Sequence, residues 1–337
     1  MLPVGKLKLD FLESILPDSE RDSRVIVGAR VGEDAAVIDF GETCLVAKTD
    51  PITFATDEIG WYLVCVNSND IAAMGAVPKW LLVTILLPER YATEDLVSNI
   101  MAQIASACEH FDIALCGGHT EVTHGLDRPI VVGQMLGEVM KEKLILSSGA
   151  QEGDDLILTK GLGIEATSII ARERESELAG KYSSAFLARA KEHLTSPGIS
   201  VLKDALAAAD AGGVNAMHDP TEGGVATAVH ELCRAARLGA VVREKQLFLS
   251  EEARLLCTEF ELNPLGVISS GALLIATSPT GTREIVDALG KEGIVSDVIG
   301  EFQDRDEGVW LEKENGERQP LPIFESDEIT KIFDTTE

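Results

Sequence analysis

The sequence predicts a two-domain α/β protein, because strands and helices alternate along both halves of the chain. The chain has 337 residues, and a length near twice the typical domain of about 100–200 residues favours two domains. Hydrophobic residues make up 45% of the chain and charged residues 25%, which is typical of a folded chain with a sizeable core. A polar, glycine-containing stretch at 147–155 predicts a boundary between a domain of residues 1–148 and a domain of residues 149–337.

The first half is expected to begin with a β-hairpin. Two β-prone runs, 35–40 and 43–48, flank Gly41-Glu42, a sequence that favours a tight turn. Residues 59–76 are apolar on nearly all sides, which predicts a buried helix that ends near Gly75. The remaining elements expected here are a strand at 80–87, a helix at 93–111, a short strand at 113–116 and a strand at 129–139.

The second half shows the same alternation, so it is expected to form a separate α/β sandwich. The segment from Glu325 onward is polar and is expected to fray. The elements expected before it are strands at 156–159, 214–217 and 272–277, and helices from about 164 and at 199–211, 225–238 and 282–289.

Charge and cysteine content exclude several function classes. Asp and Glu number 56 and Lys and Arg 29, so the net charge is −27, and this field repels nucleic acid and anionic membranes. A phosphate-bearing small ligand remains compatible if Mg²⁺ lies between it and the carboxylates. The six cysteines form no C-x-x-C pair, and residues 1–10 lack the apolar core of a signal peptide. We therefore expect a cytoplasmic protein with reduced thiols and neither nucleic acid nor membrane as a partner.

Acidic residues gather at the ends of the predicted hairpin. Glu33 and Asp34 precede its first strand, and Asp50 closes its second strand. If the hairpin pairs as expected, Asp34 and Asp50 lie at the same end, where two carboxylates repel unless a cation lies between them. Asp57 could add a third carboxylate. The alternative for each residue is an ordinary acidic turn.

Polar residues also interrupt the apolar helix predicted at 59–76. Asn67 and Asp70 are three residues apart and share a helix face. Leaving such groups buried without partners would cost about 1–3 kcal/mol each. A buried hydrogen-bond network or a helix kink would explain them, but we favour a role in binding a ligand or metal.

A third polar site follows the strand expected at 113–116. Gly117 and Gly118 precede His119, Thr120 and Glu121. Paired glycines permit a tight turn or a close approach of the backbone to a ligand, and ligands tend to bind at the carboxyl ends of strands. Taken singly, His119 and Glu121 could equally be ordinary loop residues.

The second half has two comparable strand-to-helix junctions. In the first, His218 and Asp219 lead through Thr221 into two glycines, and such a helix start can approach an anion. Capping of the helix by Asp219 or Thr221 is the structural alternative. In the second, Lys160 opens a Gly-x-Gly turn, which is neither a Walker loop nor a Rossmann fingerprint. Taken together, the carboxylate patches predict a Mg²⁺–polyphosphate site built without a P-loop.

The order of these motifs resembles the aminoimidazole-ribonucleotide (AIR) synthetase superfamily over nearly the whole chain. This superfamily includes the hydrogenase maturation protein HypE, thiamine-monophosphate kinase and selenophosphate synthetase. The motifs that carry the resemblance are Gly32-Glu33-Asp34-Ala35-Ala36-Val37, Thr49-Asp50, Ile59-Gly60, 66–70 with Met74-Gly75-Ala76-Val77-Pro78, Gly117-Gly118-His119-Thr120, and His218-Asp219-Pro220-Thr221-Glu222-Gly223-Gly224.

The resemblance implies a PurM-like fold of two α/β domains, in which the N-terminal domains of a homodimer pair to complete a β-barrel. It also implies ATP and Mg²⁺ at the dimer interface. By motif, Asp34, Asp50 and Asp70 resemble the ligands of Mg²⁺ and phosphate, and Asp57 a further contributor. The nucleotide-binding set that we expect also includes Asn67, Gly117, Gly118, Thr120 and Lys160.

Within the superfamily the chain is most similar to the HypE-like branch, with three departures. Glu222 stands where that branch has Arg, and His119-Thr120-Glu121 replaces its Asp-Thr-Lys. That branch also ends in a cysteine that carries a carbamoyl group, whereas the last cysteine here is Cys257. The kinase branch shares Ile59-Gly60-Trp61, but its late Gly-Glu-Asp-Tyr-Glu motif is absent. The selenophosphate branch needs a reactive cysteine near the N-terminus, and the first cysteine here is Cys44, within a predicted strand.

The leading hypothesis is an ATP-dependent enzyme, related to the hydrogenase maturation branch, that activates a carbonyl, amide or similar oxygen by phosphoryl transfer. The acceptor would be a small molecule or a group on another protein. His119 or His218, the latter beside Asp219, would act as acid or base, although both histidines could equally be structural. The alternatives are a small-molecule kinase and a non-catalytic nucleotide-binding protein that works through a partner chain.

Overall fold

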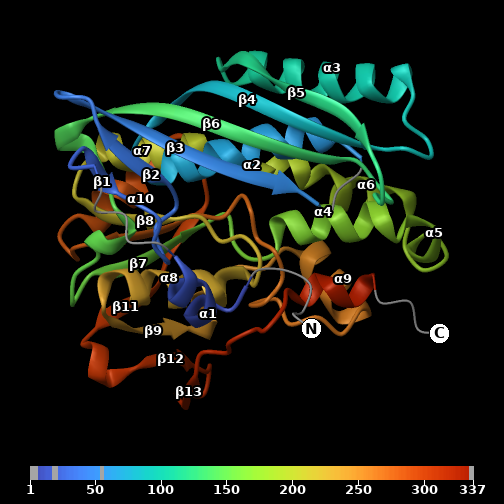
Figure 1. The fold of residues 1–337 in the computed structure, drawn as a ribbon. Helices are drawn as coiled ribbons and strands as arrows, with labels where there is room; N and C mark the ends of the chain where they lie inside the picture. The colour runs from blue at the N-terminus through green and yellow to red at the C-terminus, as the bar shows by residue number, and fades with distance from the viewer. Residues whose placement is uncertain (1–6, 17–21, 54–56, 334–337) are drawn as a thin grey trace.

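The computed structural model describes residues 7–16, 22–53 and 57–333, which form two β-sheets with helices packed between and around them (Figure 1). The first sheet contains the strands before residue 141, and the second contains those from residue 155 onward. Within the described residues, no helix is long and apolar enough to cross a membrane. This mixed architecture confirms the predicted α/β fold class.

The first sheet has six strands in the order β1-β2-β3-β6-β4-β5. Neighbouring strands are antiparallel except for the parallel pair β4 and β5. The predicted hairpin is confirmed as β2 and β3, with Gly41 in the turn at a φ of +95°. The strands are β1 (Val25–Val27), β2 (Ala36–Asp39), β3 (Thr43–Ile52), β4 (Val77–Pro88), β5 (Ala114–Thr123) and β6 (Ile130–Met140).

Two helices follow from the apolar patterns of the first half. Helix α2 (Ile59–Ala73) is buried on nearly all sides, because it packs against β3 and β6 on one side and against the second half of the chain on the other. Helix α3 (Glu94–His110) buries one stripe against α2, and Thr93 caps its N-terminus. The short α1 (Leu9–Ile15) lies beside the second half of the chain, where its Asp10 pairs with Arg234.

The second sheet has seven strands in the order β13-β12-β9-β11-β7-β10-β8. Its strands are β7 (Asp155–Thr159), β8 (Val214–His218), β9 (Gly239–Arg243), β10 (Leu274–Thr277), β11 (Ser296–Gln303), β12 (Val309–Glu312) and β13 (Arg318–Pro320). Its helices are α4 (Ile164–Glu173), α5 (Glu175–Leu178), α6 (Ser184–Glu192), α7 (Leu202–Ala211), α8 (Gly224–Ala236), α9 (Glu251–Glu259) and α10 (Thr282–Lys291).

Two sequence-based predictions about these elements were wrong. The strand expected at 113–116 does not end at the glycine pair, because β5 continues through Gly117 and Gly118 to Thr123 in parallel pairing with β4. The segment from Glu325 is not frayed as far as Phe333, because Ile329 and Ile332 are buried and the Asp327 carboxylate accepts backbone hydrogen bonds. Residues 334–337 lie outside the described part.

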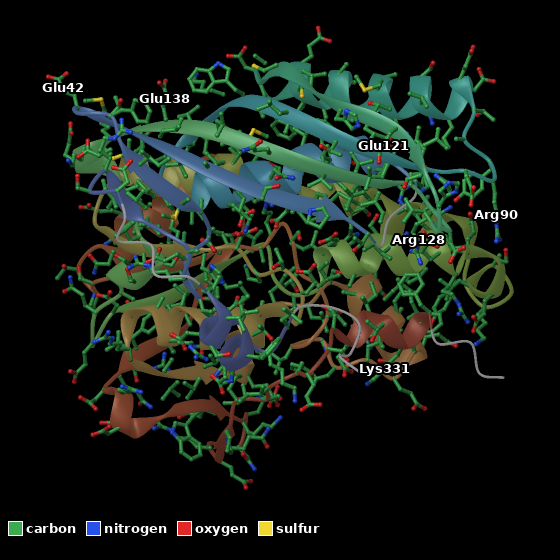
Figure 2. All side chains as sticks on the ribbon, in the orientation of Figure 1. Glu42, Arg90, Glu121, Arg128, Glu138 and Lys331 are labelled. Carbon is green, nitrogen blue, oxygen red and sulfur yellow. The ribbon has the colours of Figure 1, made fainter. Side chains whose placement is uncertain are left out.

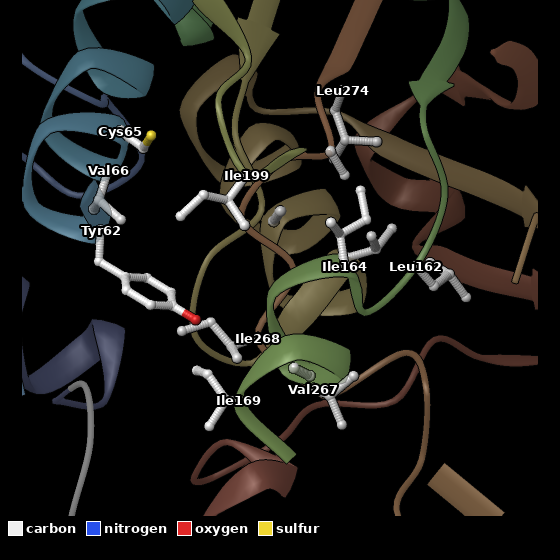
Figure 3. Packing of buried hydrophobic residues seen from close by; sticks show 14 of the residues in the cluster. Tyr62, Cys65, Val66, Leu162, Ile164, Ile169, Ile199, Val267, Ile268 and Leu274 are labelled. Carbon is white, nitrogen blue, oxygen red and sulfur yellow. The ribbon is translucent and has the colours of Figure 1, made fainter. Parts of the chain in front are cut away.

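The two halves share one hydrophobic core. Figure 3 shows Tyr62 and Val66 of α2 facing Ile199 and Ile268 of the second half. Asn69 adds a polar link across the same boundary: its Nδ2 donates to the Ile199 carbonyl at 2.8 Å, and its Oδ1 accepts from the Val201 amide at 2.8 Å. The walls of any cavity between the halves are therefore held together by packing and by buried hydrogen bonds.

Asn69→Ala is expected to destabilise the protein by about 2 kcal/mol, because it leaves two buried backbone groups without partners. The free energy of unfolding in urea measures this effect. The matched control is Asn99→Ala on the exposed surface of α3, which should change stability by less than about 0.5 kcal/mol. Equal stability of the two variants would show that the Asn69 link contributes nothing.

Candidate active site

A cavity of about 770 Å³ lies between the two halves of the chain, and acidic side chains dominate its lining. The first half contributes the loop before β2, the end of β3, one turn of α2 and the loop between β5 and β6. The second half contributes the start of α4, the end of β8 with the loop after it, one turn of α8 and the segment before β10. The charged lining residues are Glu33, Asp34, Lys48, Asp50, Asp70, Asp127, Arg128, Glu165, His218, Asp219, Glu222 and Glu231.

Three of these carboxylates form a compact buried cluster. One oxygen each of Asp34, Asp70 and Asp219 lies within 4.8 Å of the other two, and each residue is at most 5% exposed. They come from the loop before β2, from α2 and from the loop after β8, so the fold brings both halves together at this point. Buried carboxylates this close repel one another unless a cation or proton is shared among them.

Lys48 supplies positive charge beside the cluster. Its Nζ lies 2.9 Å from Asp70 Oδ1 and 3.3 Å from Asp50 Oδ2. Burial raises the pKa of Asp70 well above its usual value, although Lys48 acts in the opposite direction and Asp219, Asp50 and Asp34 add to the rise. Asp70 Oδ2 has no hydrogen-bond partner among the described residues. It is therefore a buried oxygen that can coordinate a cation.

His218 ends β8 between two carboxylates. Its Nδ1 pairs with Asp34, and its Nε2 lies 2.9 Å from Glu231 Oε2 of α8. Burial opposes protonation of the ring, but these two anions outweigh it and hold the pKa of His218 well above its usual value. At neutral pH the ring is therefore a cation that fixes the orientation of Asp34.

Other predicted site residues have structural partners. Asn67 accepts from the Asp50 amide at 3.0 Å and donates to the Leu63 carbonyl at 2.9 Å, so it joins α2 to β3. Glu33 accepts from the amides of Ser147 and Ser148. The Gly223 amide at the start of α8 donates to Asp327 at 2.6 Å, whereas the sequence offered Asp219 or Thr221 as the capping alternative at this helix start.

Two predicted ligands do not line this cavity. Asp57 is exposed and pairs with Arg172 of α4. Lys160 lines a different cavity, where its Nζ donates to the Ser200 carbonyl at 2.7 Å and lies 3.1 Å from Asp204. Burial lowers the pKa of Lys160, and Asp204 opposes that shift. The structure thus gives both side chains ion-pair partners away from the aspartate cluster.

The Gly117–Thr120 motif also lies outside the cavity. These residues are exposed on β5, the edge strand of the first sheet, and the His119 ring lies 3.2 Å from Glu121. Figure 2 shows Glu121 on this outer strand, whereas Arg128, in the loop before β6, lines the cavity. Within one chain, the motif therefore does not meet the aspartate cluster.

Sequence reasoning missed Glu165 and Glu231, which both line the cavity. Glu165 lies in the first turn of α4, where an acidic residue is usually explained by the helix dipole. Glu231 lies in the middle of an amphipathic helix, where a single Glu is usually exposed. The residue patterns gave no signal for either one, because their roles come from contacts with residues distant in the chain: Glu231 pairs with His218, and Glu165 lies beside Ser270.

The comparisons with known proteins agree with this architecture. Residues 32–139 match the N-terminal domain, and residues 151–311 the C-terminal domain, of AIR synthase related proteins. A putative hydrogenase expression/formation protein of Methanocaldococcus jannaschii is 28% identical over 301 residues, covering 87% of this chain and 86% of that protein. The carbamoyl dehydratase HypE of Escherichia coli is 27% identical over 319 residues and 89% of each chain.

A kinase and an ATP-bound hydrogenase maturation protein are also similar to this chain. A thiamine-monophosphate kinase of Aquifex aeolicus is 26% identical over 244 residues, covering 70% of this chain and 75% of the kinase. A crystal structure of the hydrogenase maturation protein HypE in complex with ATP shares the fold with a TM-score of 0.72, at 20% identity, over 94% of this chain and 91% of that chain. Because the two domain matches together span most of the sequence, the chain belongs to the AIR synthase-related family.

Proposed function

We propose that this chain is an ATP-dependent enzyme that activates a carbonyl, amide or similar oxygen by phosphoryl transfer, in the manner of the hydrogenase maturation branch. The observation that carries the proposal is the buried cluster of Asp34, Asp70 and Asp219 beside Lys48. It lies in a cavity of a size suited to a small-molecule ligand. The relatives named carbamoyl dehydratase and the fold shared with an ATP-bound protein support it.

The residues of the cluster fit Mg²⁺. The ion prefers hard oxygen ligands, and it is usually bound through one or two carboxylates plus substrate phosphates. Asp34, Asp70 and Asp219 supply such oxygens, and Asp70 Oδ2 has no other partner among the described residues. Bound Mg²⁺ would neutralise the charge of the polyphosphate and orient its terminal phosphate.

The chain's own residues would position the reaction. Lys48, held between Asp50 and Asp70, would place a positive charge beside the phosphates. His218 would act as a positioning residue for Asp34 rather than as a base, because its ring is already protonated between two carboxylates. Arg128 lines the same cavity and is a further cationic side chain available to a phosphate.

The acceptor would come from outside the chain. All six cysteines lie in the described part, five of them buried, and none lines the cavity. A thiol-bound acceptor would therefore be presented by another protein, and a small-molecule acceptor is the other possibility.

The nucleotide-binding unit would be a homodimer. The edge strand β5 is exposed along nearly its whole length, and exposed edges invite pairing with another strand. The face of the first sheet opposite α2 is only half-buried, and cross-strand pairing places Leu45, Leu82, Val132 and Leu136 on it, beside the exposed Gln134 and Glu138. A second copy would cover this face, and only from that copy would Gly117, Gly118, His119 and Thr120 approach nucleotide in the cavity.

The proposed domains are residues 1–148 and 149–337. The division between the two sheets supports this boundary, as do the two family matches, which end at 139 and begin at 151. The nucleotide cavity then lies between the domains, and the open sheet face belongs to the N-terminal one.

Product analysis tests the reaction class. With Mg²⁺ and ATP, an S-carbamoyl-cysteine peptide should lose one water to become a thiocyanate, because the amide oxygen departs with the phosphate while ADP and inorganic phosphate form. The kinase relative supports a second candidate function. In that case thiamine monophosphate, or another acceptor, would gain a phosphoryl group and no inorganic phosphate would appear. Mass spectrometry of the acceptor, with phosphate release measured in parallel, separates the two outcomes.

A further inference from the structure

A second polar feature of the cavity is the pair of Glu165 and Ser270. Glu165 lies in the first turn of α4, and Ser270 lies in the segment before β10. Both line the cavity that holds the aspartate cluster, and they are 4% and 1% exposed. No hydrogen bond of standard geometry reaches Glu165 Oε2 or Ser270 Oγ from the described residues, although Ser270 lies close enough to the carboxyl to lower its pKa. Buried polar atoms rarely stay without a well-formed hydrogen bond, so two such atoms in the wall of one cavity indicate a ligand that bonds to both.

The surroundings of Glu165 keep its carboxyl neutral. Burial raises the pKa of Glu165 to about 8, Glu222 and Asp327 add to the rise, and the adjacent Ser270 opposes it. A protonated carboxyl presents one O–H donor and one carbonyl acceptor side by side. The titratable groups that face Glu165 from other elements are Tyr62, Cys65, Glu222 and Asp327.

These surroundings select the charge of a ligand. The two charged groups with the largest effect on the pKa of Glu165 are both acidic, Glu222 and Asp327. A ligand carboxylate or phosphomonoester placed beside Glu165 would be repelled by Glu222 and Asp327. An uncharged group with one donor and one acceptor would match both the protonated carboxyl and the Ser270 hydroxyl.

We propose that Glu165 and Ser270 form the acceptor subsite of the cavity, where they bind an uncharged group that carries both a hydrogen-bond donor and an acceptor. The inference rests on the proposed function, since it places the acceptor in the same cavity as the Mg²⁺–phosphate cluster. The proposal assigns recognition of the acceptor to two residues that lie outside the aspartate motifs. It also explains why a carboxyl group is buried here apart from that cluster.

Nuclear magnetic resonance of protein labelled with ¹³C at the glutamate carboxyl tests this subsite. The Glu165 resonance is identified by its loss in Glu165→Gln. It should titrate with a midpoint near pH 8, far above the usual glutamate value of about 4.3. Acetamide should shift this resonance, whereas acetate at equal concentration should not. A midpoint near the usual value, or no response to acetamide, would overturn the proposal.

Two substitutions separate recognition from folding. Glu165→Gln keeps one donor and one acceptor, so it should retain acetamide binding, whereas Glu165→Leu should weaken that binding by about tenfold or more. Glu192→Gln, at an exposed position of the same domain, is the charge control and should change nothing. Similar acetamide affinities in the Gln and Leu variants would contradict the subsite.

The same samples distinguish failure of the subsite from failure of the proposed function. Mg²⁺-dependent binding of a non-hydrolysable ATP analogue is measured in each variant, and acetamide binding is measured with and without that analogue. Loss of the acetamide response with intact nucleotide binding would refute the subsite alone. Absence of nucleotide binding in the unmodified protein would refute the proposed function, whatever acetamide does.

Discussion

Asp70→Asn is expected to lower Mg²⁺-dependent ATP turnover by about 100-fold or more. Asp70 contributes one of three clustered carboxylate oxygens, and its Oδ2 has no other partner among the described residues. Asparagine has nearly the same shape but lacks the negative charge that holds a divalent cation. The substitution also removes the closest carboxylate partner of Lys48. Turnover is measured as ADP release at saturating ATP, with the Mg²⁺ concentration varied.

Asp57→Asn is the matched control for this prediction. Asp57 is exposed and paired with Arg172, outside the cavity, so its loss should leave ATP turnover within about twofold, as an exposed ion pair contributes little. Circular dichroism and urea unfolding confirm that both variants fold. Full activity in Asp70→Asn, or equal losses in the two variants, would refute the assignment of the cluster as the Mg²⁺ site.

Gly118→Ala is expected to destabilise the protein by about 3 kcal/mol. A Cβ atom at this position would lie 1.8 Å from the Val83 carbonyl oxygen, so β5 would have to move away from β4. The backbone also has a φ of +151°, which side chains rarely adopt. The free energy of unfolding in urea measures the loss.

Gly117→Ala separates the steric clash from the backbone strain. Gly117 has the same φ of +151°, but nothing lies within 4 Å of an added Cβ. Its substitution should therefore cost only the strain of about 1–2 kcal/mol. If both variants were equally stable, the close approach of β5 to β4 would not be what requires glycine at position 118.

Local sequence patterns were sufficient to predict the elements whose conformation is determined by residues close to them in the sequence. The hairpin of β2 and β3 follows from two β-prone runs around Gly41, and α2 follows from a long apolar segment. Asp34 and Asp70 were found because each interrupts such a pattern. A charged residue in apolar surroundings is visible in sequence, since it conflicts with the burial that its neighbours imply.

The parts that could not be predicted depend on contacts between distant segments. Asp219 completes the cluster only because β8 ends beside α2 and the loop before β2. The ion pair of Asp57 with Arg172 likewise joins residues far apart in the chain. The glycine pair was interpreted as a tight turn or a close approach of the backbone to a ligand after a strand ending at 116, but here the two glycines permit β5 to pass close to β4.

Calorimetric titration of ATP into the unmodified protein, with Mg²⁺ and again with EDTA, is the decisive measurement for the proposed nucleotide site. Saturable binding is expected with Mg²⁺, and loss of that binding is expected in EDTA, because the phosphates reach the buried aspartates only through the cation. Binding of equal strength in EDTA, or no binding in either condition, would contradict a Mg²⁺–nucleotide site at Asp34, Asp70 and Asp219.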